Sequence, residues 1–315
     1  MILVAGSSNL DFVVRAHHIP APGETVLGRD FKTFPGGKGA NQAVACARAG
    51  GASTTLLTAM GADSFATPIA NSLREASVAV HIVRINDQPT GTAFICVSED
   101  AENAITVAPG ANLCLLEQHL PKLQDVSHLL MQLEIPLTTV IAYAKAARQQ
   151  GVTTVLNAAP IQQLPTELLE WIDILVVNEG ELASLSGHSG SIAECLERIA
   201  VPTVVVTLGH RGCCARFQGA FLVQPACAIT PVDTTAAGDT FCGCLVAALS
   251  NGAIMPQALS LAGAAGALAC TRLGAQSSIP QQAQVATFLA QQPPKTAAAM
   301  AALGDYCGLP TGTYS

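Results

Sequence analysis

Short apolar runs alternate with longer segments of mixed polarity along most of the chain. The apolar runs predict buried strands at 2–5, 54–58, 128–133, 152–157, 172–177 and 202–207. The segments between them predict helices at 36–49, 66–75, 114–120, 137–149, 165–170 and 179–199. Beyond residue 211, short strands are predicted at 213–217 and 221–226, and helices at 236–250, 256–271 and 281–291. Such alternation is typical of an α/β fold with a doubly wound, mostly parallel sheet flanked by helices.

Two stretches interrupt this rhythm. Short strands at 12–15, 25–27 and 31–34 are separated by Pro and Gly turns, and a second group at 92–97 and 104–107 surrounds a polar turn. We therefore expect a small β-sheet inserted in two segments, about 11–35 and 89–107, that forms a lid at the carboxyl edge of the main sheet. The pattern predicts no element between 76 and 91. Residues 1–292 form the predicted main domain, and the Ala-rich segment 293–315 is expected to be a tail without a core pattern.

The composition excludes several classes of protein. Of 315 residues, half are hydrophobic and 12% are charged, and 15 basic against 22 acidic residues give a net charge of −7. Without a basic run, the chain is not expected to bind nucleic acid or an anionic membrane surface. The uncharged stretch 240–271 is broken by Ser250-Asn251-Gly252 and by Pro256, so it predicts two buried helices rather than a membrane span.

The cysteines point to a reducing compartment. There are eleven, an odd number, and they are scattered through apolar segments without a C-x-x-C motif. The N-terminus lacks the basic region of a signal peptide. We therefore expect free buried thiols in a cytoplasmic protein. The seven histidines show no paired metal-ligand spacing.

The segment Asp233-Thr234-Thr235-Ala236-Ala237-Gly238-Asp239-Thr240-Phe241 carries the clearest chemical signal. Small residues precede a charge-free apolar helix, so a ligand can approach the free N–H groups of its first turn, which attract anions. A carboxylate at Asp239, beside an anion site, makes sense as the proton acceptor for an attacking hydroxyl. The alternative is that Asp233 and Asp239 are helix caps.

A second Gly-rich loop, 36–41, also opens a helix. It matches neither a Walker P-loop nor a dinucleotide fingerprint, and by itself it is also compatible with a simple tight turn. The polar residues near the two N-terminal strand ends, Asn9, Asp11, Lys38 and Asn41, are suited to hydrogen-bonding a polyol.

Two further loops follow apolar strands. Asn178 and Glu181 supply amide and carboxylate groups that suit positioning of phosphate and metal, or else form the N-cap and first turn of the next helix. The glycines of the loop 207–212 allow a nucleotide to lie against the backbone.

These motifs, in this order, resemble the ribokinase-like sugar kinase family over about residues 2–291. The resemblance is carried by the segments 36–43, 109–112, 130–134, 178–181, 207–212, 233–241 and 274–280. It implies a ribokinase-like fold with a small β-sheet lid, through which family members commonly form a homodimer.

The resemblance also implies residue roles. Asp239 would be the general base, and Ala236, Ala237 and Gly238 would form the anion hole. The implied sugar ligands are Asn9, Asp11, Gly37, Lys38, Asn41, Glu134 and Asp239. The implied nucleotide site consists of Asn178, Glu181, Thr207, Gly209, Gly212 and Gly238. A monovalent cation would be held by two loops, by Asp233 and Thr235 in 233–235 and by Gly274 and Ser278 in 269–278. Arg272 is the one basic residue in these two loops.

The implied activity is ATP-dependent phosphorylation of D-ribose at O5, with Mg2+ and an activating K+. The alternatives are a kinase for another pentose, for deoxyribose or for a nucleoside, and, from a different class, a catalytically silent sugar or nucleotide sensor. The presence of Asp239 disfavours the sensor.

Overall fold

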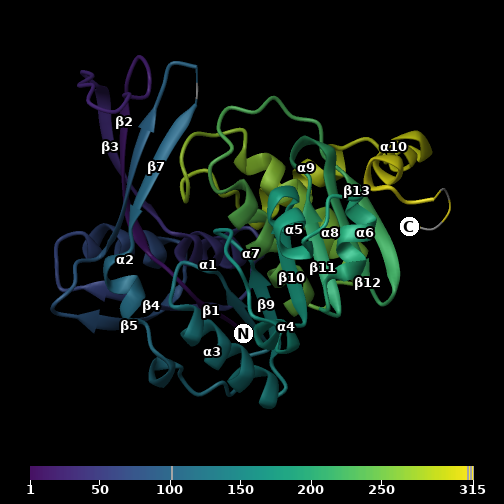
Figure 1. The fold of residues 1–315 in the computed structure, drawn as a ribbon, viewed down its shortest axis with the longest axis horizontal. Helices are drawn as coiled ribbons and strands as arrows, with labels where there is room; N and C mark the ends of the chain where they lie inside the picture. The colour runs from purple at the N-terminus through teal and green to yellow at the C-terminus, as the bar shows by residue number, and fades with distance from the viewer. Residues whose placement is uncertain (101, 311, 313, 315) are drawn as a thin grey trace.

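Two β-sheets and the helices around the larger one make up the computed structural model, which describes residues 1–100, 102–310, 312 and 314 (Figure 1). Within these residues, the larger sheet has nine strands in the order β13-β12-β11-β10-β9-β8-β1-β4-β5. Its strands are β1 (Ile2–Ala5), β4 (Thr54–Gly61), β5 (Ala79–Ile85), β8 (His128–Met131), β9 (Thr153–Asn157), β10 (Ile174–Asn178), β11 (Thr203–Thr207), β12 (Gly212–Phe217) and β13 (Ala220–Pro225). All neighbours pair in parallel except β11–β12 and β12–β13. The predicted fold class is confirmed.

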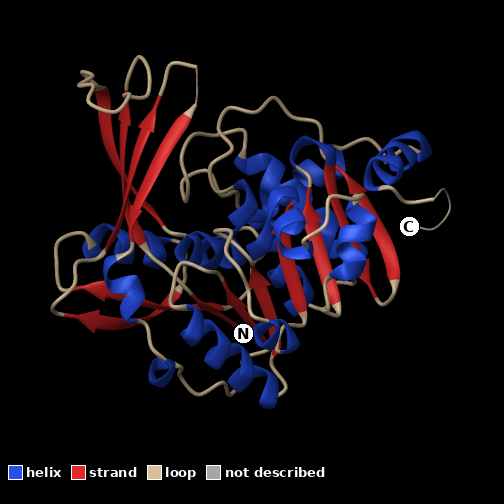
Figure 2. Ribbon diagram, viewed as in Figure 1, coloured by secondary structure: helices blue, strands red, loops and turns tan. Residues whose placement is uncertain are grey.

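The second sheet has the order β3-β2-β6-β7 and stands apart from the main body (Figure 2). It consists of β2 (Asn9–Arg15), β3 (Arg29–Gly36), β6 (Gly91–Val97) and β7 (Asn103–Ala108). The chain runs from β1 through Gly6, Ser7 and Ser8 directly into β2, so the small sheet is rooted at the carboxyl end of a central strand.

Helices cover both faces of the main sheet (Figure 2). They are α1 (Lys38–Arg48), α2 (Ala66–Glu75), α3 (Leu137–Gln149), α4 (Thr166–Glu170), α5 (Glu179–Ser186), α6 (Ile192–Arg198), α7 (Ala237–Ser250), α8 (Met255–Ala269), α9 (Gln282–Gln291) and α10 (Ala297–Cys307), with 3-10 turns at Gly110–Cys114, Glu117–His119 and Gly209–Arg211. Side chains alternate across β1, so Ile2 and Val4 pack against α1 and α7, whereas Leu3 and Ala5 pack toward α3.

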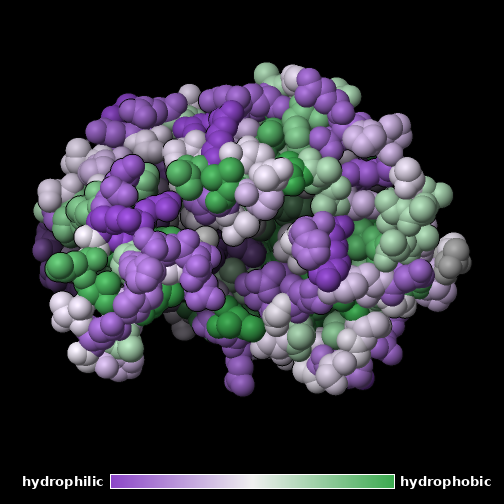
Figure 3. All heavy atoms as spheres, turned by 90° about the horizontal axis from the view of Figure 1, so that it is seen from above, coloured by the Kyte–Doolittle hydropathy of each residue, from purple (hydrophilic) through white to green (hydrophobic). Residues whose placement is uncertain are grey.

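The carboxyl ends of the parallel strands meet at the upper edge in Figure 1. Figure 3 views this edge end-on and shows a hollow near its centre. Ligands of open α/β sheets bind at this edge, because the loops that leave the strands gather there.

Two strand predictions differ from the structure. Residues 25–27 belong to a loop, because they have no neighbouring strand to pair with, and Leu27 is 92% exposed. The edge strand β5 lies where the hydrophobic pattern predicts no element. Its side chains are only partly buried, so its apolar signal is weak.

Two helix predictions also differ. The single helix expected at 179–199 is α5 and α6, because Gly187 ends α5 with φ 59° and Ser191 caps α6 through the backbone N–H of Glu194. The helix expected at 114–120 is replaced by two 3-10 turns at Gly110–Cys114 and Glu117–His119.

The segment after residue 292 packs against the main body as α10. Leu303 and Cys307, one helical turn apart, are buried in the cluster that covers the α3 face, although no core pattern is predicted for the tail. These two apolar positions could have indicated the buried face of the helix, but they are hard to recognise in an Ala-rich segment. Within the described residues, no helix is both long and apolar enough to span a bilayer.

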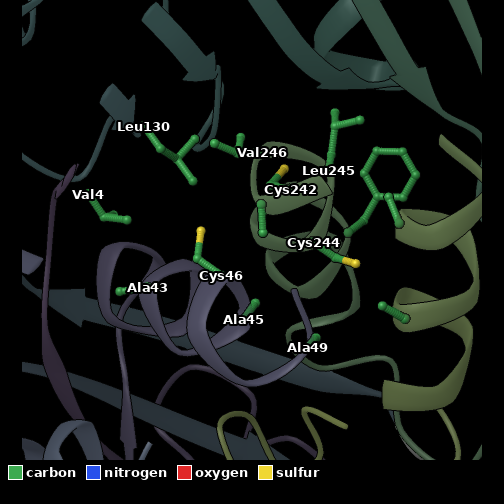
Figure 4. Packing of buried hydrophobic residues seen from close by; sticks show 14 of the residues in the cluster. Val4, Ala43, Ala45, Cys46, Ala49, Leu130, Cys242, Cys244, Leu245 and Val246 are labelled. Atoms are coloured by element: carbon green, nitrogen blue, oxygen red, sulfur yellow. The ribbon is translucent and has the colours of Figure 1, made fainter. Parts of the chain in front are cut away.

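Helices α1 and α7 pack unusually closely beneath the carboxyl edge, and small side chains make this possible (Figure 4). Cys46 and Cys242 are buried in the same cluster. A Cβ added to Gly243 would lie 2.5 Å from the Ala45 Cβ and 2.5 Å from the Gln42 carbonyl oxygen. The contact therefore requires glycine at this position, although the residue lies within a helix.

We expect Gly243→Ala to destabilise the unliganded protein by about 1–3 kcal/mol, because the new methyl group overpacks the α1–α7 contact. The matched control is Gly263→Ala in α8, where no atom lies within 4 Å of the added Cβ. Better helix propensity should there leave stability unchanged or raise it by up to about 1 kcal/mol. Urea unfolding measures both, and equal effects of the two substitutions would contradict the close-packing argument.

Candidate active site

Polar side chains from four elements converge at the hollow edge. Asp11 lies over Gly36 at the end of β3, where an added Cβ would be 2.1 Å from its Oδ2, so a larger residue there would displace the Asp11 carboxyl group. Asn41 donates from Nδ2 to the Asp239 Oδ2 at 3.0 Å. The backbone N–H of Lys38 donates to the Glu134 Oε2 at 3.1 Å, and Gly37 before it has φ 88°. The structure thus brings the predicted sugar-binding residues of β2 and α1 together with Glu134 and Asp239.

Three carboxyl groups face one lysine in this cluster. Burial, together with the charges of Glu134 and Asp239, raises the pKa of Asp11 to about 7. Burial opposes the charge of Lys38, but Asp239, Glu134 and Glu181 outweigh it and raise the pKa of the ammonium group. The lysine therefore remains charged and partly neutralises the cluster.

The first turn of α7 forms the centre of the site. Ala236 precedes the helix with φ 58°, a left-handed conformation that costs a non-glycine residue energy. No described side chain caps this helix. The Ala237 N–H donates to the Thr234 carbonyl at 3.2 Å, whereas no described group accepts from the N–H groups of Ala236 and Gly238, so these two are available to an anion. The helix-cap alternative is wrong for Asp239, because its buried carboxylate accepts hydrogen bonds from Asn41 and Gln42 instead.

A cavity of about 500 Å³ lies on the other side of this turn. The predicted nucleotide residues Thr207, Gly209, Gly212 and Gly238 line it, as do Ala237 and His210. Further lining comes from residues 224–229, at the end of β13 and after it, from Phe241 of α7, and from Gly263, Gly266, Ala267 and Cys270 of α8 and its C-cap; of these, only Phe241 lies in a sequence motif. These small and apolar residues suit the flat face of a base, but nothing in their spacing marks them in advance.

Asn178 and Glu181 stand beside that cavity rather than in its lining. Asn178 pairs in register with Thr207 on the neighbouring strand. The Glu181 N–H donates to the Asn178 Oδ1, and the Asn178 N–H donates to the Glu181 Oε2, each at 2.8 Å. This reciprocal pair is the helix-capping alternative, which the structure confirms. Burial raises the pKa of Glu181, and its charge acts on Lys38.

The two loops of the candidate cation site meet at Asp233. Its Oδ1 accepts from the backbone N–H and hydroxyl of Thr235, and its Oδ2 accepts from the Gly274 N–H at 2.9 Å. Ser278 is buried, but its hydroxyl donates to the Ala275 carbonyl within its own loop. Arg272 is not the only basic residue near this carboxylate. The charge of Arg15 from the small sheet also contributes to the lowered pKa of Asp233.

Several buried amides have structural roles that the sequence reading does not assign. Gln42 donates to Asp239, Gln132 donates to Gln42, and Asn157 accepts from Gln42. Asn112 donates to the Asn9 Oδ1 at 2.8 Å and so orients the first sugar-site residue. Gln42, Gln132 and Asn112 lie within the segments that carry the family resemblance, which is the available signal.

Comparisons with known proteins cover the whole region of this site. Residues 1–282 match the family described as pfkB family carbohydrate kinase. A ribokinase from Haemophilus influenzae is 38% identical over 300 residues, covering 91% of this chain and 98% of that protein. The crystal structure of a ribokinase from Thermotoga maritima gives a TM-score of 0.86 at 35% sequence identity. The match covers 92% of this chain and 99% of that chain. The structure of Arabidopsis thaliana ribokinase complexed with ribose and ATP gives a TM-score of 0.84 at 32% sequence identity. The match covers 91% of this chain and 98% of that chain.

The buried carboxyl group of Asp11 predicts a pH-dependent stability. Between its usual value near 4 and its raised pKa of about 7, Asp11 is protonated in the folded state and ionised in the unfolded chain, so stability falls as pH rises through this window. Asp11→Asn should therefore weaken the fall in unfolding free energy between pH 5 and pH 8 and leave the unliganded variant more stable at pH 8. Urea titrations at several pH values test this, and parallel curves for both proteins would refute it.

Proposed function

The chain belongs to the pfkB family of carbohydrate kinases, and we propose that it transfers the γ-phosphoryl group of ATP to the O5 hydroxyl of D-ribose. The main support is the position of two consecutive residues. Gly238 lines the nucleotide cavity, and Asp239 is hydrogen-bonded to Asn41 in the polar cluster. The uncapped first turn of α7 therefore separates a site for a nucleotide from a site for a polyol, as a direct phosphoryl transfer requires.

The proposed mechanism follows from this arrangement. Asp239 accepts the proton of the sugar hydroxyl as its oxygen attacks the γ-phosphorus, and ADP leaves on the opposite side. The N–H groups of Ala236 and Gly238 would face the charge that develops on the transferred group, and that of Ala237 would join them once it leaves the Thr234 carbonyl. Asn9, Asp11, Lys38, Asn41 and Glu134 hold the sugar so that one hydroxyl meets Asp239.

Two metal ions belong to this proposal. Mg2+ bound to the ATP phosphates would neutralise their charge, and the buried carboxylate of Glu181, beside the cavity, suits one such contact. The described residues contain no group of three or more His, Cys, Asp or Glu side chains able to hold a metal. For K+, Asp233 would supply a carboxylate, and backbone carbonyls of Thr235 and of the Gly274 loop would complete the ligand set; in the structure Asp233 accepts from the Thr235 hydroxyl and the Gly274 N–H.

We also propose that the small sheet acts as a lid and as a dimer interface. Its strands carry exposed apolar residues, including Phe31 at 63%, Phe94 at 53% and Ile105 at 55%. Phe12 stacks with both phenylalanines and so makes this patch continuous. A cytoplasmic location is supported by the eleven cysteines, which are all free.

Substrate choice is tested by ADP release with ATP, Mg2+ and a panel of sugars and nucleosides. D-ribose should give the highest kcat/KM. If deoxyribose or a nucleoside gives a higher kcat/KM, that compound and not ribose is the preferred substrate.

We expect Asp239→Asn to lower kcat about 100- to 10,000-fold, because the amide cannot accept the hydroxyl proton. The dissociation constant for ribose should change much less, since the amide keeps the size of the side chain. The measurements are the initial rate and sugar binding to the folded variant. Turnover close to that of the wild type would remove Asp239 from the role of base.

Replacing Na+ with K+ at fixed ionic strength should raise the rate severalfold. A cation beside Asp233 would order the turn that presents the N–H groups of 236–238. It should also raise the thermal unfolding temperature of the ATP-free protein, a readout independent of turnover. If K+, Na+ and a large organic cation give equal rates and equal unfolding temperatures, the cation site does not exist, whereas the kinase assignment stands.

A further inference from the structure

A chain of buried amide side chains leads from the middle of the main sheet to Asp239. Gln132 donates from Nε2 to the Gln42 Oε1 at 2.6 Å. Gln42 donates from Nε2 to the Asn157 Oδ1 and to the Asp239 Oδ1, each at 2.9 Å. Gln42 and Gln132 are fully buried, and Asn157 is nearly so. Gln42 thus contacts one carboxylate oxygen away from solvent, and Gln132 and Asn157 hold Gln42 in place.

The direction of these bonds is fixed from both ends. Asn157 donates from Nδ2 to the Val176 carbonyl, which can only accept, so its oxygen must face Gln42. Gln42 therefore presents its NH2 group to Asn157 and to Asp239, and its oxygen faces the NH2 group of Gln132. An ionised carboxylate also accepts only, so the polarity of the chain agrees with a charged Asp239 and disagrees with a protonated Oδ1.

The two oxygens of Asp239 differ in their surroundings. Oδ1 faces the fully buried Gln42, whereas Oδ2 accepts from Asn41, which belongs to the proposed sugar set. A sugar hydroxyl that contacts Asn41 would therefore lie on the Oδ2 side of the carboxylate.

We infer that Gln42 is a positioning residue for phosphoryl transfer: it holds Oδ1 of Asp239 as a fixed acceptor, so that Oδ2 alone takes the sugar proton. This inference rests on the proposed role of Asp239. Gln42 does not touch the sugar. Its loss should therefore lower the rate of the chemical step rather than the affinity for the sugar.

The test is Gln42→Met, which keeps the length of the side chain and removes the donor. We expect kcat to fall about 10- to 100-fold, with the KM for ribose within about threefold of the wild type. Gln132→Met is the second variant. It keeps the bond between Gln42 and Asp239 but frees the Gln42 oxygen, and we expect a smaller loss of about 3- to 10-fold in kcat.

Thr240→Val is the matched control. Thr240 is fully buried directly after Asp239, and its hydroxyl has no hydrogen-bond partner within the described residues. Removing that hydroxyl should leave kcat within about twofold of the wild type. A loss in Thr240→Val equal to that in Gln42→Met would attribute both to general packing and overturn the inference.

The pH–rate profile separates positioning from packing. An N–H donor stabilises the charged form of a carboxylate, so the acidic limb of kcat should move to higher pH in Gln42→Met. Lys38, Asp11, Glu134 and Glu181 also carry or develop charge around this site, and the pKa of Asp11 is about 7, whereas burial raises the pKa of the Cys242 thiol and keeps it neutral. These groups are identical in both proteins, so the difference between the two profiles reports the change at Gln42.

Asp239→Asn measured in parallel distinguishes the two possible failures. Loss of turnover in Asp239→Asn with normal kcat and an unshifted profile in folded Gln42→Met overturns the inference alone. Normal turnover in Asp239→Asn overturns the proposed base, and the inference with it. If Gln42→Met does not fold, normal kcat and an unshifted profile in Gln132→Met also overturn the inference.

Discussion

The contact between the first turns of α1 and α7 is the constraint on which the site depends. Asn41 and Gln42 in α1 each bond one oxygen of Asp239 in α7, so the proposed base is held by a helix from the other half of the chain. The bonds form only because the helices approach closely, and Gly243 permits this. The same approach brings the polar cluster at the start of α1 next to the N–H groups at the start of α7. The same helix contact therefore packs the core and sets the geometry of the candidate site.

The small sheet is fixed to this core at its base and free at its tips. Asp63 accepts from both the backbone N–H and the hydroxyl of Thr90, just before β6. Asn112 bonds Asn9 at the start of β2 and accepts from the Ser8 N–H. These contacts, part-buried at Asp63 and buried at Asn112, tie the bases of two strands of the proposed lid to the main body. The outer parts of the strands carry exposed apolar residues and have few contacts with the main sheet. Closure over a bound sugar would then bend the sheet without moving Asn9 and Asp11.

Much of the fold could be predicted from the sequence, because parallel strands buried on both faces give continuous apolar runs. The strand β5 and the helix α10 could not, since an edge strand buries only part of its surface and an Ala-rich helix shows few large apolar positions. The candidate site residues are predicted from Gly-rich motifs and from the family resemblance, which alone supplies Glu134. The amide chain is not predicted, because a buried Gln looks like a surface Gln in a sequence, and only the fold reveals that Gln42 meets Gln132 and Asn157. The cavity lining after β13 has no polar marker at all.

The charge balance of the polar cluster also bears on the choice of substrate. Asp11 is buried beside Glu134 and Asp239, and the raised pKa of Asp11 reflects the resulting cost of a further negative charge. A small sugar brings several hydroxyl donors to this space, where Glu134 and Asp239 already accept from Lys38, Asn41 and Gln42 but no described residue donates to the Asp11 carboxyl group. Each hydroxyl that binds therefore offsets part of a desolvation cost already present in the free protein. A sugar that lacks one of these hydroxyls leaves an acceptor unpaired in a buried site, which costs about 1–3 kcal/mol. The burial of these carboxyl groups, which is costly in the empty site, thus also favours a fully hydroxylated pentose over a sugar that lacks a hydroxyl group.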